Sequence, residues 1–220
     1  MTGREEMKKL SSVLARRRQE ERQERKDRIL EAAKIVFFRG GYLGATVRDI
    51  ALEAELSTGL IYHYFAGKDA VYGKVCEEAF GVLLDVMKST DLDGLSVEED
   101  LTTLTKAYVR FYTDYPELFE ILSFRDMGFK RVGLPEEISR RLDSLSFQAV
   151  SMLNDVILKG MEKKSISKVD NPWEMTIGLW SMIEGIIFNH KRGYLDTFGL
   201  DLDQLVERQL MILFDGIRVR

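Results

Sequence analysis

The chain has 220 residues, 45% of them hydrophobic, which is enough apolar material for a sizeable core and excludes disorder for most of the sequence. No apolar run exceeds five residues and the N-terminal stretch is charged, so we expect no membrane partner and no export, and therefore a cytoplasmic protein. The formal net charge of −4 hides a basic N-terminal part, because residues 1–75 hold 15 Lys and Arg against 11 Asp and Glu, which favours an anionic partner there.

Proline content and apolar spacing indicate an all-α protein. Only three prolines occur, each where a helix would begin, and apolar residues recur at i, i+3, i+4 and i+7. We expect about nine helices, near residues 22–39, 47–54, 58–64, 68–88, 97–114, 116–124, 135–163, 172–191 and 202–217.

The first 21 residues are polar and arginine-rich, and we expect a charged arm that is mobile or weakly helical. The run Arg16-Arg17-Arg18 has two interpretations. It is either a solvated charge run, because Glu20 and Glu21 follow at once, or an arm that tracks DNA.

Three helices follow in close succession. An apolar stripe from Ile29 to Phe37 is stopped by Gly40-Gly41. Thr46 can cap a second helix of about two turns, and Ser57 can cap a third. Two short capped helices that rest on a longer one form a helix-turn-helix.

The third of these helices has the size and chemistry that suit a DNA major groove. With Ile61 and Phe65 directed inward, the outward face carries small, polar and aromatic residues. A helix of this kind presents its N-terminal end to phosphates and base edges. The outward residues are Thr58, Gly59, Tyr62 and His63.

Residues 28–72 read RILEAAKIVFFRGGYLGATVRDIALEAELSTGLIYHYFAGKDAVY. The paired alanines and phenylalanine of the first helix, the G-Y-x-x-x-T link, I-A-x-x-A, S-x-G-x-I-Y-x-Y-F and a lysine three residues later make this segment resemble the DNA-binding domain of the TetR family of transcriptional regulators. The resemblance implies DNA contacts from Thr46, Arg48, Ser57, Thr58, Tyr62, His63 and Lys68, with Gly59 allowing close approach.

Among these residues, Tyr62 and Lys68 are expected to bind phosphates, and Thr58 and His63 to reach bases. One residue departs from the family pattern: Glu55 stands in the turn where the family usually has glycine. It must adopt a left-handed conformation, at a cost of roughly 1 kcal/mol, or distort the turn.

The sequence after residue 75 offers no catalytic or metal-binding pattern. It has no H-E-x-x-H, no glycine-rich phosphate loop and no nucleophile elbow, so we do not expect an enzyme. Cys76 is the single cysteine, and His63 lies far along the chain from His190, so we expect neither a metal nor another cofactor.

Large aromatic and methionine side chains are abundant in this part, either as ordinary core or as the lining of an apolar ligand cavity. The TetR resemblance favours a small-molecule effector, apolar or amphipathic. The basic segment 125–131 could bind the anionic end of an acyl-CoA. The expected ligand-binding residues are Tyr108, Phe111, Tyr112, Phe119, Phe124, Met127, Phe147, Met152, Trp180 and Phe188.

The last two predicted helices, near 172–191 and 202–217, are expected to form a homodimer as a four-helix bundle. Gly178 and Gly185 allow close helix approach on one. The other has an apolar stripe of Leu202, Leu205, Val206, Leu210, Leu213 and Ile217. Ordinary packing within one chain is the alternative.

The sequence thus predicts an arm over 1–21, a helix-turn-helix domain over 22–70, and a larger helical effector-binding and dimerisation domain over 71–220. The predicted function is a ligand-responsive repressor that binds a near-palindromic operator as a dimer. The alternatives are a helical enzyme with a DNA-binding head, or a structural DNA-binding protein without an effector.

Overall fold

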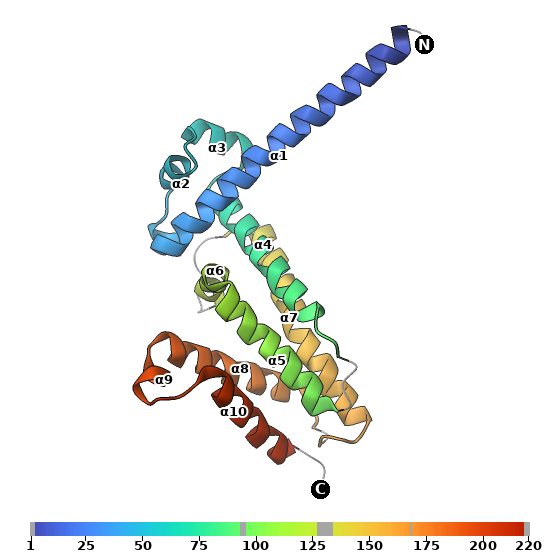
Figure 1. Ribbon diagram of the computed structural model, residues 1–220, viewed down its shortest axis with the longest axis vertical. Coiled ribbons are helices and arrows are strands. Elements are labelled where there is room, and N and C mark those ends of the chain that lie inside the picture. The colour runs from blue at the N-terminus through green and yellow to red at the C-terminus, as the bar shows by residue number, and fades with distance from the viewer. Residues whose placement is uncertain (1–2, 93–95, 127–133, 168, 218–220) are drawn as a thin grey trace. The chain divides into compact units, whose positions relative to one another are not determined.

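The computed structural model describes the backbone of residues 3–92, 96–126, 134–167 and 169–217, and their side chains except in 3–11 and 124–126. Within these ranges the chain forms ten helices and no strand, which confirms the all-α prediction (Figure 1). The helices are α1 (Gly3–Gly44), α2 (Val47–Glu53), α3 (Thr58–Tyr64), α4 (Lys68–Lys88), α5 (Val97–Asp114), α6 (Pro116–Asp126), α7 (Glu136–Glu162), α8 (Pro172–Lys191), α9 (Tyr194–Thr197) and α10 (Leu202–Ile217). None of the helices described is long and apolar enough to cross a membrane.

Helix α1 corrects the sequence prediction for the N-terminal arm. It begins at Gly3 instead of near residue 22 and continues without a break into the predicted first helix. Residues 4–39 contain neither glycine nor proline and are rich in Arg, Lys, Glu and Gln, which are good helix formers. At the stop predicted for Gly40-Gly41 the structure has a kink, where Gly41 has a φ of 62°, and the helix continues beyond it to Gly44.

Helix α9 was missed by the sequence reasoning. It has a single turn, which is too short to show an apolar period, and glycines with positive φ, Gly193 and Gly199, stand on either side of it. This turn connects α8 to α10.

The chain divides into two compact units. The first comprises Met1–Glu77 with Glu120–Ser139, and the second Glu78–Phe119 with Arg140–Arg220. The first unit is centred on fully buried aliphatic side chains from its three N-terminal helices and α4: Ile29, Ala33, Ile50, Ile61 and Val71. The second unit has its own core, which includes Phe111, Leu142, Ile157, Leu179 and Ile187.

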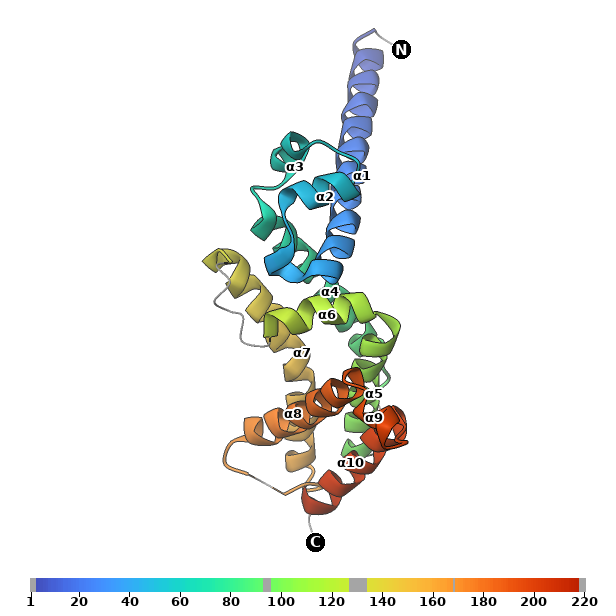
Figure 2. The same cartoon turned by 90° about the vertical axis from the view of Figure 1, so that its left-hand side faces the viewer.

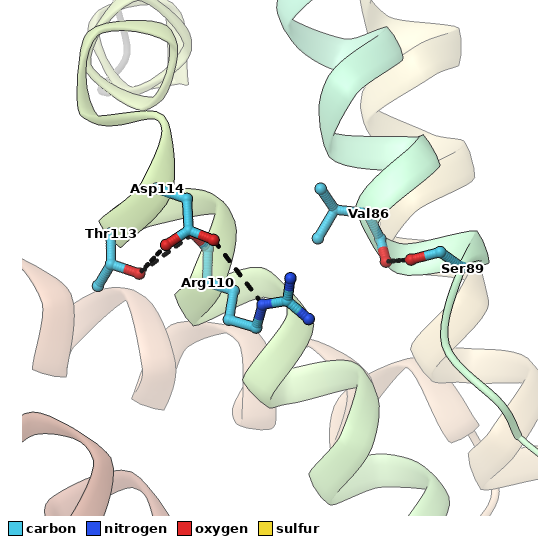
Figure 3. Close-up of polar contacts among 5 residues, drawn as sticks. All are labelled: Val86, Ser89, Arg110, Thr113 and Asp114. Carbon is cyan, nitrogen blue, oxygen red and sulfur yellow. Dashed lines mark hydrogen bonds and ion pairs between the residues drawn. The ribbon is translucent and has the colours of Figure 1, made fainter.

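Side chains close the C-terminal ends of α4 and α5 in the second unit (Figure 3). The Ser89 hydroxyl donates to the Val86 carbonyl at 2.8 Å, and the Thr113 hydroxyl donates to the Arg110 carbonyl at 3.2 Å. Asp114 lies 3.8 Å from the Arg110 guanidinium. The Ser89 contact satisfies the carbonyl of Val86, which lies in the last turn of α4 and has no partner within that helix.

In the turn between α2 and α3, Glu55 adopts the left-handed conformation, which is the first of the two predicted alternatives. Its backbone is left-handed, with φ 52°. Its carboxylate accepts a hydrogen bond from the Arg28 guanidinium on α1 at 2.8 Å. This exposed ion pair ties the turn to α1 but offsets only part of the backbone cost.

We therefore predict that Glu55→Gly is more stable to urea than Glu55→Ala by roughly 0.5–1 kcal/mol. Both variants lose the Arg28 pair, so the comparison isolates the backbone conformation. Equal unfolding free energies in the two variants would contradict the left-handed assignment.

Candidate nucleic-acid interface

Helix α2 is held at its start by a capping box. The Thr46 hydroxyl accepts from the Asp49 N–H at 3.2 Å, and the Asp49 carboxylate accepts from the Thr46 N–H at 2.9 Å. The Thr46 hydroxyl also donates to that carboxylate at 2.6 Å. Because these hydrogen bonds favour the charged form, they lower the pKa of Asp49 below its ordinary value.

Helix α3 is positioned by one cap and one anchor. The Ser57 hydroxyl accepts from the Leu60 N–H at 3.2 Å. Ile61 is completely buried and Phe65 is half-buried, so the helix is fixed by the side that the sequence pattern indicated.

The opposite side of α3 is open to solvent. Thr58, Gly59 and His63 are exposed, and 59% of Tyr62 is accessible. Arg48 on α2 is also exposed. The structure therefore leaves the predicted base-reading side chains accessible and places them in the same unit as the caps, Thr46 and Ser57.

Lys68 has a role that the sequence reasoning missed. Its ammonium donates to the backbone carbonyls of Tyr42 at 2.8 Å and Ala45 at 3.0 Å. It also lies 4.2 Å from the centre of the Tyr42 ring. Lys68 therefore fastens the segment that leads from α1 to the Thr46 cap.

Tyr42 joins that segment to α4 a second time. Its hydroxyl donates to the Asp69 carboxylate at 2.5 Å. Burial, followed by the hydrogen bond and negative charge of Asp69, raises the pKa of Tyr42. The tyrosine of the G-Y-x-x-x-T link was a sequence signal for this contact, although its partners lie 26 and 27 residues away.

An aromatic cluster packs beside these contacts. The rings of Phe37 and Tyr72 are 5.0 Å apart, and those of Tyr42 and Tyr72 are 4.8 Å apart. Edge-to-face and tilted pairs of this kind add to the stability gained from burial alone.

The ten predicted ligand-binding residues differ in their exposure to solvent. Phe111 and Phe119 are buried in the core, whereas Phe147 and Phe188 are exposed at the surface, where Phe147 lies against Trp173. Tyr108, Tyr112, Met152 and Trp180 are half-buried. The side chain of Phe124 and all of Met127 lie outside the described residues, as does most of the segment 125–131.

A small cavity lies among α4, α5, α7 and α8 of the second unit. Its volume of about 10 Å³ leaves room for roughly one water molecule. Of the predicted residues, only Tyr108 and Trp180 line it, and their rings are 4.9 Å apart. The other lining residues are Met87, Leu104, Thr105, Leu153 and Ile183.

Two polar features accompany this cavity. The Thr105 hydroxyl is buried and has no hydrogen-bond partner among the described residues. The Tyr108 hydroxyl donates to the Glu184 carboxylate, and one turn along α5 the Tyr112 hydroxyl lies 2.6 Å from His190 Nδ1. Sequence reasoning missed Thr105 because a threonine within an amphipathic helix gives no distinctive signal.

A family model described as "Bacterial regulatory proteins, tetR family" matches residues 29–75, which span the capped helices and the Lys68 contacts. Over this segment the chain is similar to the regulatory proteins of the tetR family. It is 29% identical over 138 residues to the transcriptional repressor NicS of Pseudomonas putida, covering 63% of this chain and 64% of NicS. It is 32% identical over 116 residues to the repressor SCO4008 of Streptomyces coelicolor, covering 53% and 57%. The matches thus span less than two thirds of either relative.

Solved structures extend the TetR likeness of the fold beyond the helix-turn-helix. A tetR-family regulatory protein from Rhodococcus RHA1 has a TM-score of 0.70 at 17% identity, covering 89% of this chain and 98% of that one. PfmR from Thermus thermophilus has a TM-score of 0.67 at 20% identity, covering 85% and 97%.

The second unit exposes apolar side chains on α8 and α10. Ile177 and Phe188 on α8 are 51% and 41% accessible, and Met211 and Ile212 on α10 are 65% and 64% accessible. Val206 and Leu210, which belong to the apolar stripe predicted for the dimer contact, are instead buried within the unit. The exposed apolar residues of α10, Met211 and Ile212, are not part of that stripe.

The capping box predicts the effect of Thr46→Ala. This variant should lower the unfolding free energy by about 1 kcal/mol at neutral pH, because one N–H of the first turn loses its acceptor. Thr46→Ser keeps the hydroxyl and serves as the control in urea titrations.

The same box predicts a dependence on pH. The folded-state pKa of Asp49 lies below the ordinary 3.8, so its stabilising effect is complete above 3.8 and is lost as pH falls through the folded value. The stability difference between wild type and Thr46→Ala should therefore shrink on acidification through this range. A difference that is constant with pH would contradict the proposed pairing.

Proposed function

We propose that the protein is a transcriptional regulator that binds operator DNA through α3 and represses transcription until a small-molecule effector releases it. The observation that carries this proposal is the orientation of α3, with Ile61 completely buried and Tyr62 59% accessible on the opposite side. The two relatives described above are repressors by name, which supports repression as the direction of control.

The exposed residues suit the parts of a DNA duplex that a helix of this size meets. The seven residues of α3 span roughly 10 Å, which fits a major groove about 12 Å wide. Thr58 and His63 offer hydrogen-bonding groups to base edges, and Gly59 allows the backbone to approach. Tyr62 and Arg48 donate to phosphates.

Lys68 contributes to DNA binding in two ways in this proposal. Two of its three ammonium protons hold the Tyr42 and Ala45 carbonyls, and the third remains to face a phosphate. The Lys68 ammonium therefore both positions the Thr46 cap of α2 and binds a DNA phosphate.

A homodimer would present two copies of α3 to successive major grooves of a near-palindromic operator. The exposed Ile177 on α8 and Met211 and Ile212 on α10 supply apolar area for this contact. We place the second subunit on these helices, and the whole assembly in the cytoplasm with the DNA.

The effector site belongs to the second unit in this proposal. The cavity beside Tyr108 and Trp180 is too small for an organic molecule as it stands, so a ligand must open it. Its walls suit an apolar body with one group that hydrogen-bonds to the Thr105 hydroxyl. An acyl-CoA remains a candidate effector if the basic residues of segment 125–131 bind its anionic end.

The effector can act only if it binds two conformations unequally. Helix α4 supplies residues to both units, because the boundary between them falls after Glu77. We propose that an effector-favoured shift of α4 changes the spacing of the two DNA-binding helices.

The DNA-binding proposal predicts that Tyr62→Ala and Lys68→Ala weaken binding to duplexes of every sequence. Removal of the Lys68 charge should also reduce the slope of log affinity against log salt by about 0.9 for each phosphate that is no longer neutralised. Fluorescence anisotropy at several salt concentrations measures both effects, on a duplex selected by the wild-type protein.

Lys74→Ala is the matched control, because it removes the same charge from an exposed position on the same helix, α4. It should leave both the affinity and the salt slope unchanged. Unaltered binding by both Tyr62→Ala and Lys68→Ala would contradict the proposed DNA-binding face.

The buried Thr105 hydroxyl, which lacks a partner in the described part of the chain, predicts a stability gain from Thr105→Val. Replacement of a buried hydroxyl that lacks a partner by a methyl group should raise the unfolding free energy by about 1 kcal/mol. Thr105→Ser, which keeps the hydroxyl, is the control in the same denaturation assay. A loss of stability in Thr105→Val would show that the hydroxyl already has a partner.

A further inference from the structure

The N-terminal part of α1 is a helix that the rest of the first unit does not cover. It extends past α2 and α3 in both views (Figures 1 and 2). Residues 12–28 are exposed apart from Val13 and Lys26, which are half-buried. At about 1.5 Å per residue, the stretch from Gly3 to Ile29 is roughly 40 Å long.

Four basic side chains share one side of this exposed helix. With about 100° of rotation per residue, Arg18, Arg22, Arg25 and Lys26 fall within about 100° of the helix circumference. We call these four residues the basic stripe. Glu20, Glu24 and Asp27 fall within about 60° on the opposite side.

Several other polar side chains of this segment have partners within the unit. Arg16 pairs with Glu20 at 3.3 Å, Gln23 donates to Asp27 at 2.7 Å, and Arg28 pairs with Glu55. By contrast, no ion pair joins a residue of the basic stripe to any side chain that the structure describes. Four cations along about 12 Å of helix are therefore available to an outside anion.

The basic stripe lies on the side of α1 that packs into the core of the first unit, where α1 contacts α2 and α2 contacts α3. Ile29 and Ala33 are completely buried, and at the same rotation per residue they fall within the arc of the stripe. The side of α1 that packs into the core therefore becomes, beyond the end of the core, a basic side open to solvent. We expect a duplex bound by the outer face of α3 to lie on this side of α1.

We propose that the basic stripe is a second DNA contact, which binds phosphates of the duplex next to the base pairs read by α3. This inference rests on the proposed function, because it takes the DNA-binding role of α3 as given. A guanidinium group can bind two oxygens of one phosphate, and this contact does not depend on the base sequence. The stripe therefore increases the affinity for any operator and makes it more sensitive to salt. A membrane surface fits less well, because the stripe contains no apolar residue.

The test compares two double variants that remove the same charge from the same helix. Arg22→Gln with Arg25→Gln removes half of the stripe, and Arg16→Gln with Arg17→Gln is the control, since neither residue belongs to the stripe. Glutamine keeps a high helix propensity. Circular dichroism and thermal unfolding confirm that both variants fold like the wild type.

The probes are two duplexes that contain the site selected by the wild-type full-length protein from a random pool. One ends at the base pairs protected by the protein, and the other has in addition about one helical turn of unrelated sequence on each side. We expect the stripe variant to lose about tenfold in affinity for the longer duplex, with a shallower salt slope, and the control variant to lose less than twofold. Arg22→Lys with Arg25→Lys should restore most of the binding.

Three outcomes would overturn this inference. Wild-type affinity in the stripe variant would overturn it while leaving the proposed function intact. Equal losses in the two double variants would show a general charge effect and overturn it as well. Failure of the wild type to bind any duplex would overturn both the inference and the proposed function.

Discussion

The complete burial of Ile61 is the constraint on which the account of this protein depends. Helix α3 has only seven residues, so one side chain held in the core determines which side of the helix faces out. Thr58, Tyr62 and His63 are accessible as a consequence. If Ile61 were not anchored, the same residues would have no defined direction from which to read DNA.

The contacts around α2 and α3 make this orientation rigid. Thr46 and Asp49 cap α2, Ser57 caps α3, and Lys68 holds the chain that enters the first of these caps. Each cap contributes about 1 kcal/mol, which matters for helices of seven residues that would not form alone. The left-handed backbone of Glu55 has a cost that the exposed pair with Arg28 offsets in part.

The sequence was sufficient for features that depend on neighbouring residues and insufficient for those that depend on distant ones. Caps at Thr46 and Ser57 follow from local spacing, and the structure contains both. For Glu55 the spacing left two conformations open, and the structure has the left-handed one. The hydrogen bonds from Lys68 to backbone carbonyls join residues more than 20 positions apart, and no local sequence pattern predicts them. The continuous helix over residues 3–21 was not predicted, because charged helix formers show no apolar period. Phe147 was wrongly expected to line a cavity, because aromatic content alone does not distinguish core from surface.

The central claim is most directly tested by hydroxyl-radical footprinting of the unmodified protein, with oxidation of each tyrosine measured by mass spectrometry with and without operator DNA. Tyr62 and Tyr115 are 59% and 39% accessible in the free chain, so both can be oxidised. The account predicts that DNA suppresses the oxidation of Tyr62 strongly and leaves that of Tyr115 unchanged. A Tyr62 oxidation rate that stays the same in the DNA-bound protein would contradict it.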